Sequence, residues 1–154
     1  MQAAVETTTI ERVVHIAAAP ETVWPFLVDP EKATRWMGQA ATLDPRPGGM
    51  YRVEVVPRDT VLGEFVEVDP PRRVVFTWGW ERGRASDVAP GSTTVEIELE
   101  PTETGTTLRL RHRDVPVGDA TERHAHGWDH YLPRLVVAAG GGDPGDDLWL
   151  TEAP

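Results

Sequence analysis

The residues with the clearest capacity for chemistry are four histidines between positions 112 and 130. His112 alternates with Leu108 and Leu110, so its ring is expected on the buried face of a strand. His124 lies one helical turn before Trp128 in a segment with helical spacing. A buried imidazole is most often a core group with both ring nitrogens hydrogen-bonded. The alternative is a polar anchor in the apolar wall of a ligand pocket, and the sequence leaves both interpretations open.

Two further arrangements of these side chains suggest chemistry only weakly. His126 and His130 have the i, i+4 spacing that can hold a metal ion on one helix face, but no H-E-x-x-H arrangement or evident third ligand accompanies them. We therefore interpret them as a solvated face and expect no metal. His112 and Asp114 could form an acid–base pair, a pattern too general to predict an enzyme. Without a G-x-S-x-G motif or a phosphate-binding glycine loop, we expect no catalytic residue and no cofactor.

Composition narrows the classes of partner. The chain has 154 residues, enough for one domain with its own core, and it lacks cysteine, which excludes disulfides and cysteine-based zinc sites. A net charge of -10 argues against nucleic acid and anionic membrane surfaces as partners. The sequence contains no apolar run long enough to span a membrane, and its first ten residues lack the pattern of a signal peptide. We therefore expect a cytoplasmic protein.

A long amphipathic helix over residues 120–139 is expected to position His124. Trp128, Leu132 and Leu135 recur at helical spacing and form one apolar face. A single long helix after many strands indicates a sheet with one apolar face that this helix covers.

The ends and interior of this helix carry further signals. Asp119 or Thr121 can serve as its N-cap, and the glycines at 140–142 can end it. Gly127 costs about 1 kcal/mol relative to alanine, and we interpret it as a place where another element approaches closely. Pro133 removes a backbone donor and should kink the helix, and the alternative interpretation is that this kink opens a gap between helix and sheet.

Most of the remaining chain predicts strands joined by short turns. Alternating or β-branched segments are expected as strands at 7–16, 41–43, 50–56, 61–68, 73–80, 93–100 and 106–113. Their hairpin-length connections favour antiparallel pairing, with a polar loop at 81–91. Pro20 and Pro30 are expected to open two short helices after the first strand. Glutamates at 96–100 and arginines at 109–113 should form ion pairs on the outer face of the sheet.

Several ordered motifs give the chain a family resemblance. They are A-A-P-E-T-V-W at 18–24, Trp36, P-G-G-M-Y-R at 47–52, G-E-F-V-E-V-D-P-P-R-R-V-V-F-T-W at 63–78, T-T-L-R-L-R-H at 106–112 and H-A-H-G-W at 124–128. Over residues 8–140 the chain resembles START-like (SRPBCC) domains, in particular the subgroup named for activators of the 90-kDa heat-shock protein ATPase. The resemblance implies an α+β helix-grip fold, in which a curved antiparallel sheet of six to seven strands wraps around the C-terminal helix.

The same resemblance implies a cavity between sheet and helix. A small hydrophobic ligand would then meet the inward-facing side chains Tyr51, Phe76, Trp78, His112, Trp128 and Leu132. Two alternatives stay open: a co-chaperone-type interaction protein with a chaperone as its partner, and a cyclase- or hydrolase-type enzyme using the same cavity.

The end of the chain is expected to behave differently from the rest of the single domain at 1–154. Residues 141–154 are rich in Gly and Asp, which predicts a flexible segment, but they include Leu148, Trp149 and Leu150. These apolar side chains predict a docking tail, on the body of the domain or on a second subunit in a homodimer.

Overall fold

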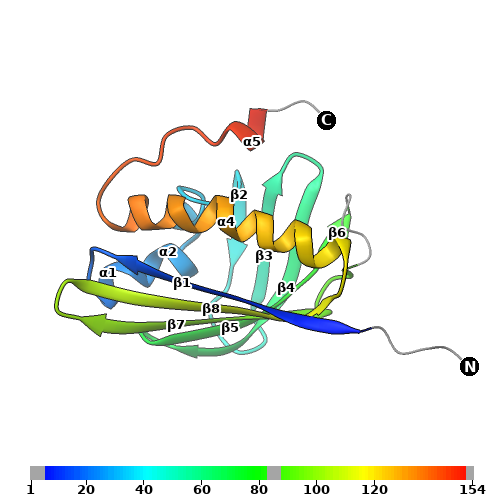
Figure 1. Ribbon diagram of the computed structural model, residues 1–154, viewed down its shortest axis with the longest axis horizontal. Helices are drawn as coiled ribbons and strands as arrows, with labels where there is room; N and C mark the ends of the chain where they lie inside the picture. The colour runs from blue at the N-terminus through cyan, green and yellow to red at the C-terminus, as the bar shows by residue number, and fades with distance from the viewer. Residues whose placement is uncertain (1–5, 83–87, 152–154) are drawn as a thin grey trace, which may run out of the picture.

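The computed structural model describes residues 6–82 and 88–151 and builds them around one curved antiparallel sheet (Figure 1). The strands are β1 (Thr7–Ile16), β2 (Ala40–Leu43), β3 (Met50–Val56), β4 (Asp59–Asp69), β5 (Arg73–Trp78), β6 (Trp80–Arg82), β7 (Thr93–Thr102) and β8 (Gly105–Pro116). Seven of them follow the order β1-β8-β7-β5-β4-β3-β2, and β6 pairs with β4 beside this path. Positions 83–87 of the expected polar loop and 152–154 of the expected tail lie outside the described residues.

The sheet exceeds the expected six to seven strands because the segment at 73–80 divides at Gly79. β5 pairs with the later part of β4 and with β7, whereas β6 pairs with Thr60 and Val61 near the start of β4. A Cβ atom at position 79 would overlap the carbonyl oxygen of Ala89, so only glycine fits this crossing. The division follows from the contact between Gly79 and Ala89, which cannot be predicted from the alternation of residues 73–80.

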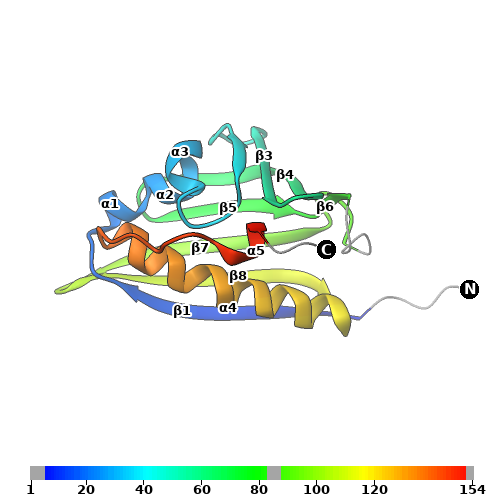
Figure 2. The same cartoon turned by 90° about the horizontal axis from the view of Figure 1, so that it is seen from above.

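Three one-turn helices follow β1, where two short helices are expected. They are α1 (Pro20–Val23), α2 (Pro25–Val28) and α3 (Pro30–Ala33), each with proline at its first position. Trp36 anchors the segment after them, because its buried indole N–H donates to the carbonyl oxygen of Phe26 at 2.8 Å. Of these helices, α3 contacts β2, whereas α1 contacts β7 and β8 (Figure 2).

The long helix α4 (Asp119–Ala139) lies across the concave face of the sheet and packs mainly on β1 and β8 (Figure 1). This arrangement confirms the helix-grip fold predicted from the sequence. The expected N-cap is wrong: Gly118 caps the helix with a φ of 114°, a conformation that glycine adopts without strain. Asp119 is the first helical residue, and the Thr121 hydroxyl donates to the carbonyl oxygen of Pro116 at 2.7 Å.

The interior of α4 departs from expectation at one of its two unusual residues. A Cβ atom at Gly127 would meet nothing within 4 Å among the described residues, so the interpretation of this glycine as a close-approach site is wrong. The helix continues through Pro133 to Ala139, and the kink expected at this proline stays a prediction.

The ion pairs on the outer face of the sheet include one that was expected, Glu96 with Arg113, and several others that centre on Arg73. Arg73 on β5 contacts Glu67 at 3.1 Å, Glu98 at 2.9 Å and Glu96 at 3.5 Å. Arg113 on β8 also contacts Glu96, at 2.7 Å. Ion pairs at a protein surface typically contribute at most about 1 kcal/mol each, so the core between sheet and helix carries most of the stability.

That core is continuous from the short helices to the start of α4 and contains most of the large side chains. Fully or nearly fully buried members include Phe65, Leu108, Leu110 and Leu135, together with the two histidines His112 and His124. In the part of the chain that the structure describes, no helix has the length and apolar character needed to cross a membrane.

Candidate functional site

The six side chains predicted to line a ligand site are brought together inside the grip. Tyr51 on β3 stacks on Phe76 on β5 with ring centroids 3.9 Å apart. Trp78, two residues further along β5, lies 5.3 Å from Trp128 on α4. Leu132 follows Trp128 by one helical turn, on the same buried face of the helix. We call these five side chains, with His112, the aromatic cluster. Every member is at most 4% exposed.

His112 sits between α4 and the sheet with both ring nitrogens hydrogen-bonded. The indole N–H of Trp128 donates to His112 Nδ1 at 3.1 Å, and His112 Nε2 lies 2.8 Å from the Thr93 hydroxyl oxygen. The Thr93 hydroxyl in turn donates a hydrogen bond to the carbonyl oxygen of Trp78 at 2.8 Å. Because an indole can only donate, Nδ1 must carry a lone pair, and Nε2 therefore carries the proton and donates to Thr93.

His124 repeats the arrangement with the opposite tautomer. The indole N–H of Trp80 donates to His124 Nε2 at 3.0 Å, so the ring proton is on Nδ1. That proton points to the carbonyl oxygen of Ala120 at 2.7 Å, one turn earlier in α4. The His124 and His112 rings meet edge to face, 5.1 Å apart. Two tryptophans thus fix the tautomers of two histidines.

The surroundings of His112 keep it neutral. Burial lowers the pKa of His112 well below its usual value of 6.5, and the neighbouring His124 lowers it further. Protonation would also place a donor against the indole N–H of Trp128. Asp114 does not pair with it: that residue is exposed, with a φ of 65°, and both nitrogens of His112 have other partners. The geometry fits a core histidine, the first of the two interpretations from the sequence.

One indole in this region lacks an acceptor. Trp80 and Trp128 donate to histidines, but Trp78 Nε1 is buried and has no hydrogen-bond partner among the described residues. The hydroxyl group of Tyr131 on α4 is in the same condition. A buried donor without an acceptor costs about 1–3 kcal/mol of stability. A bound molecule that supplied an acceptor to either donor would remove that cost.

Sequence reasoning missed Thr93 and Tyr131. Thr93 begins β7, and only the pairing of Trp78 with Thr93 across β5 and β7 reveals its link to His112. Tyr131 was expected beside the apolar stripe of the helix, and its helical position alone does not reveal that its hydroxyl is unpaired.

The face of α4 that carries His126 and His130 is covered in part by the chain end. The His130 ring stacks on Trp149 with centroids 3.6 Å apart and planes 4° apart, and His130 Nε2 lies 2.8 Å from Asp147 Oδ1. Trp149 belongs to α5 (Leu148–Thr151), and the segment that leads to α5 runs back beside α4 (Figure 2). The interpretation of His130 as part of a solvated face is therefore wrong. No group of three potential metal ligands occurs within residues 6–82 and 88–151.

Arg134 fastens the segment that leads into α5. Its guanidinium group donates to the carbonyl oxygens of Pro144 at 3.3 Å, Gly145 at 3.1 Å and Trp36 at 3.2 Å. The segment 144–150, which we call the C-terminal strap, is thereby tied to α4 and to the loop after α3, and α5 contacts β3.

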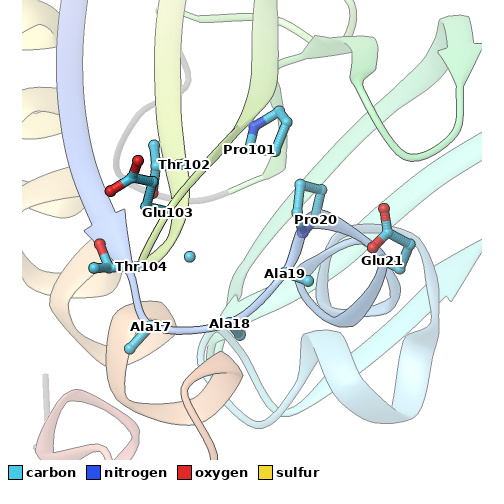
Figure 3. Close-up of a pocket in the computed structure, with 10 residues that line it drawn as sticks. Ala17, Ala18, Ala19, Pro20, Glu21, Pro101, Thr102, Glu103 and Thr104 are labelled. Carbon is cyan, nitrogen blue, oxygen red and sulfur yellow. The ribbon is translucent and has the colours of Figure 1, made fainter.

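A hollow of about 380 Å³ lies elsewhere on the molecule (Figure 3). Residues 17–21, between β1 and α1, form one side, and residues 101–105, at the β7–β8 turn, form the other. Its lining combines alanines, prolines and a glycine with the polar residues Glu21, Thr102, Glu103 and Thr104. No member of the aromatic cluster reaches it, so it is not the ligand site expected from the sequence.

Comparisons with known proteins agree with this architecture. The sequence model of the family described as "Activator of Hsp90 ATPase homolog 1-like protein" matches residues 17–140. An AHSA1-like protein from Rhizobium etli, solved by NMR, is 41% identical, with a TM-score of 0.74 over 96% of this chain and 91% of that one.

Two crystal structures of lower identity share the fold. A protein from Chromobacterium violaceum is 23% identical, with a TM-score of 0.75 over 86% of this chain and 96% of that one. CalU16 from Micromonospora echinospora is 24% identical, with a TM-score of 0.63 over 88% and 76%. No curated protein sequence matches the chain at a significant level.

Proposed function

Because the chain belongs to the family of activator of Hsp90 ATPase homolog 1-like proteins, we propose that it binds a small hydrophobic molecule between α4 and the sheet. The family is part of the START-like superfamily, whose members usually hold hydrophobic ligands in that position. The proposed lining is the aromatic cluster: Tyr51, Phe76, Trp78, His112, Trp128 and Leu132.

The observation that carries the proposal is the convergence of this cluster from four separate elements. β3, β5, β8 and α4 all direct large apolar or aromatic side chains to one place, where Tyr51 stacks on Phe76 and Trp78 meets Trp128. Aromatic rings with a few polar groups between them are typical of sites for apolar ligands. The histidine–indole hydrogen bonds hold two of the six side chains in place without using a charge.

Tryptophan emission during titration with a fatty acid and with a polyaromatic compound tests the proposal. We expect a saturable shift or quench, because Trp78 and Trp128 belong to the proposed lining. Leu132→Trp should fill the site and abolish the response. Val137→Trp, at a residue of the same helix that is 42% exposed, should preserve it. Circular dichroism checks that both variants fold. Equal responses in the two variants, or none in the native protein, would overturn the proposal.

The family description also supports a second candidate, an interaction with a chaperone of the 90-kDa class. A pull-down with that chaperone should then succeed with the native protein and with Leu132→Trp alike, because a docking surface does not depend on the interior. Loss of the pull-down in Leu132→Trp would contradict a role separate from ligand binding. A cytoplasmic location and a homodimer are further parts of the proposal, and fractionation and sedimentation test them.

Catalysis receives less support from the geometry. A cyclase- or hydrolase-type reaction in the same place would need a general base, and His112 is the central candidate. Trp128 and Thr93 occupy both of its nitrogens, so the proposal assigns His112 to the structure of the site. If His112→Ala removed a turnover while binding stayed intact, this assignment would be wrong.

A further inference from the structure

The indole and imidazole groups in and beside the aromatic cluster form a nearly closed set of hydrogen bonds. Trp80 and Trp128 donate their indole protons to imidazole nitrogens, and the second nitrogen of each imidazole is also satisfied. The Trp78 carbonyl oxygen accepts from Thr93. Trp78 Nε1 stands outside this set, because its N–H is buried and finds no acceptor in the part of the chain that the structure describes.

The position of Trp78 makes its unpaired N–H relevant to a ligand. The Trp78 ring is 4% exposed and lies centrally in the cluster, 6.5 Å from Phe76, 6.2 Å from Tyr51 and 5.3 Å from Trp128. A molecule that enters among these rings therefore comes within reach of the indole. An indole N–H is a donor only, so the group that satisfies it must be an acceptor.

We propose that Trp78 is the specificity-determining donor of the site and that the ligand is an apolar, aromatic-sized molecule with one hydrogen-bond acceptor, such as a ketone, ester or ether oxygen. This inference rests on the proposed ligand-binding function and adds the chemical class of the ligand. Neutral acceptors fit best, because no cationic side chain belongs to the described cluster and His112 is held neutral by its partners. A pure hydrocarbon would fill the same space and leave the indole unpaired.

Two probes of nearly equal shape separate these cases. 2-Acetylnaphthalene has a carbonyl group where 2-ethylnaphthalene has a methylene group. Isothermal titration calorimetry measures the Kd of each probe. The ratio of the two Kd values is compared between the native protein and Trp78→Phe, so that the different hydration of the probes cancels. We expect the native protein to favour the ketone roughly tenfold more than Trp78→Phe does.

Tyr131→Phe is the matched control, because it removes a second buried donor that has no acceptor among the described residues. It should leave the preference for the ketone unchanged. If Tyr131→Phe loses the preference and Trp78→Phe keeps it, the assignment to Trp78 is wrong.

A measurement on the native protein covers the case in which Trp78→Phe fails to fold. In a nitrogen–proton correlation spectrum, the indole resonance of Trp78, assigned through its backbone, should move downfield with the ketone and much less with the hydrocarbon. Equal movement with both probes, or equal Kd ratios in native and variant protein, overturns the inference while ligand binding stands. Failure of both probes to bind overturns the proposed function and this inference with it.

Discussion

Acid should destabilise the protein through His112, and the size of the effect follows from its burial. The ring is 0% exposed and its nitrogens are held by Trp128 and Thr93, so the folded protein keeps it neutral. Burial and the neighbouring His124 lower its pKa well below 6.5. In the unfolded chain the same side chain titrates near 6.5. Below that pH the unfolded state binds a proton at this ring and the folded state does not. The free energy of unfolding therefore falls as pH falls.

The free energy of unfolding should fall by about 1.4 kcal/mol for each pH unit below 6.5 on account of this one residue. Between pH 7.5 and 5.0 the loss is about 2 kcal/mol, which corresponds to a drop of roughly 4–8 °C in Tm for a domain of this size. The decline in stability ends only when the pH reaches the lowered pKa of His112 in the folded state.

Urea denaturation of the native protein and of His112→Gln at several pH values measures how much His112 contributes to the pH dependence of the free energy of unfolding. Glutamine can accept from one neighbour and donate to the other, but it does not titrate in this range. Its curve should therefore be flatter by about 2 kcal/mol over the same interval, whatever its overall stability. If the two curves run parallel, His112 is not the acid-sensitive group. If His112→Gln does not fold, the ring proton resonances of native His112 should stay constant from pH 7.5 to 5.0.

Three further substitutions test how α4 is held. Gly127→Ala should raise the free energy of unfolding by about 1 kcal/mol, because alanine favours the helix and its Cβ meets nothing within 4 Å among the described residues; a loss in urea denaturation would indicate hidden contacts. Trp128→Ala should lower it by about 3–5 kcal/mol through loss of a buried ring, and an unchanged Tm would contradict the packing described. Trp149→Ala should raise hydrogen exchange in the C-terminal strap, whereas Leu148→Ala, at a side chain 68% exposed, should not; equal exchange would sink the stacking argument.

Periodicity predicts several elements of this fold because β3, β7, β8 and α4 each bury one face. The alternation of Val95, Ile97 and Leu99 on β7 and the helical spacing of Trp128 and Leu132 both reflect contact with a single core. Because these patterns are local, the elements can be predicted from the sequence. The inward position of His112 follows from the same alternation.

Features that depend on contacts between residues far apart in the sequence cannot be predicted in this way. The division at Gly79 arises from the approach of Ala89, and the stacking of His130 on Trp149 depends on the path of the chain after α4. The tautomers of the histidines depend on which indole reaches which nitrogen, and strand register decides this. Pattern gives the face on which a side chain lies, whereas its hydrogen-bond partner comes from the tertiary structure.

The contacts of α4 limit how a ligand can enter the grip. Trp128 fixes the inner face of the helix through His112, Asp129 is paired with Arg12 of β1 at 2.7 Å, and Arg134 ties the other side to the C-terminal strap. A rotation of the helix would break bonds on all three sides at once, so it is a costly route. The strap is the weaker barrier, because α5 is a single turn. Beyond Arg134, the strap contacts α4 through the Trp149 ring, which meets His126, His130 and Tyr131, and through the hydrogen bond between Asp147 and His130. Displacing the strap exposes the flank of α4 next to β3 and leaves the histidine–indole bonds intact, so we expect admission of a ligand to follow the strap rather than the helix.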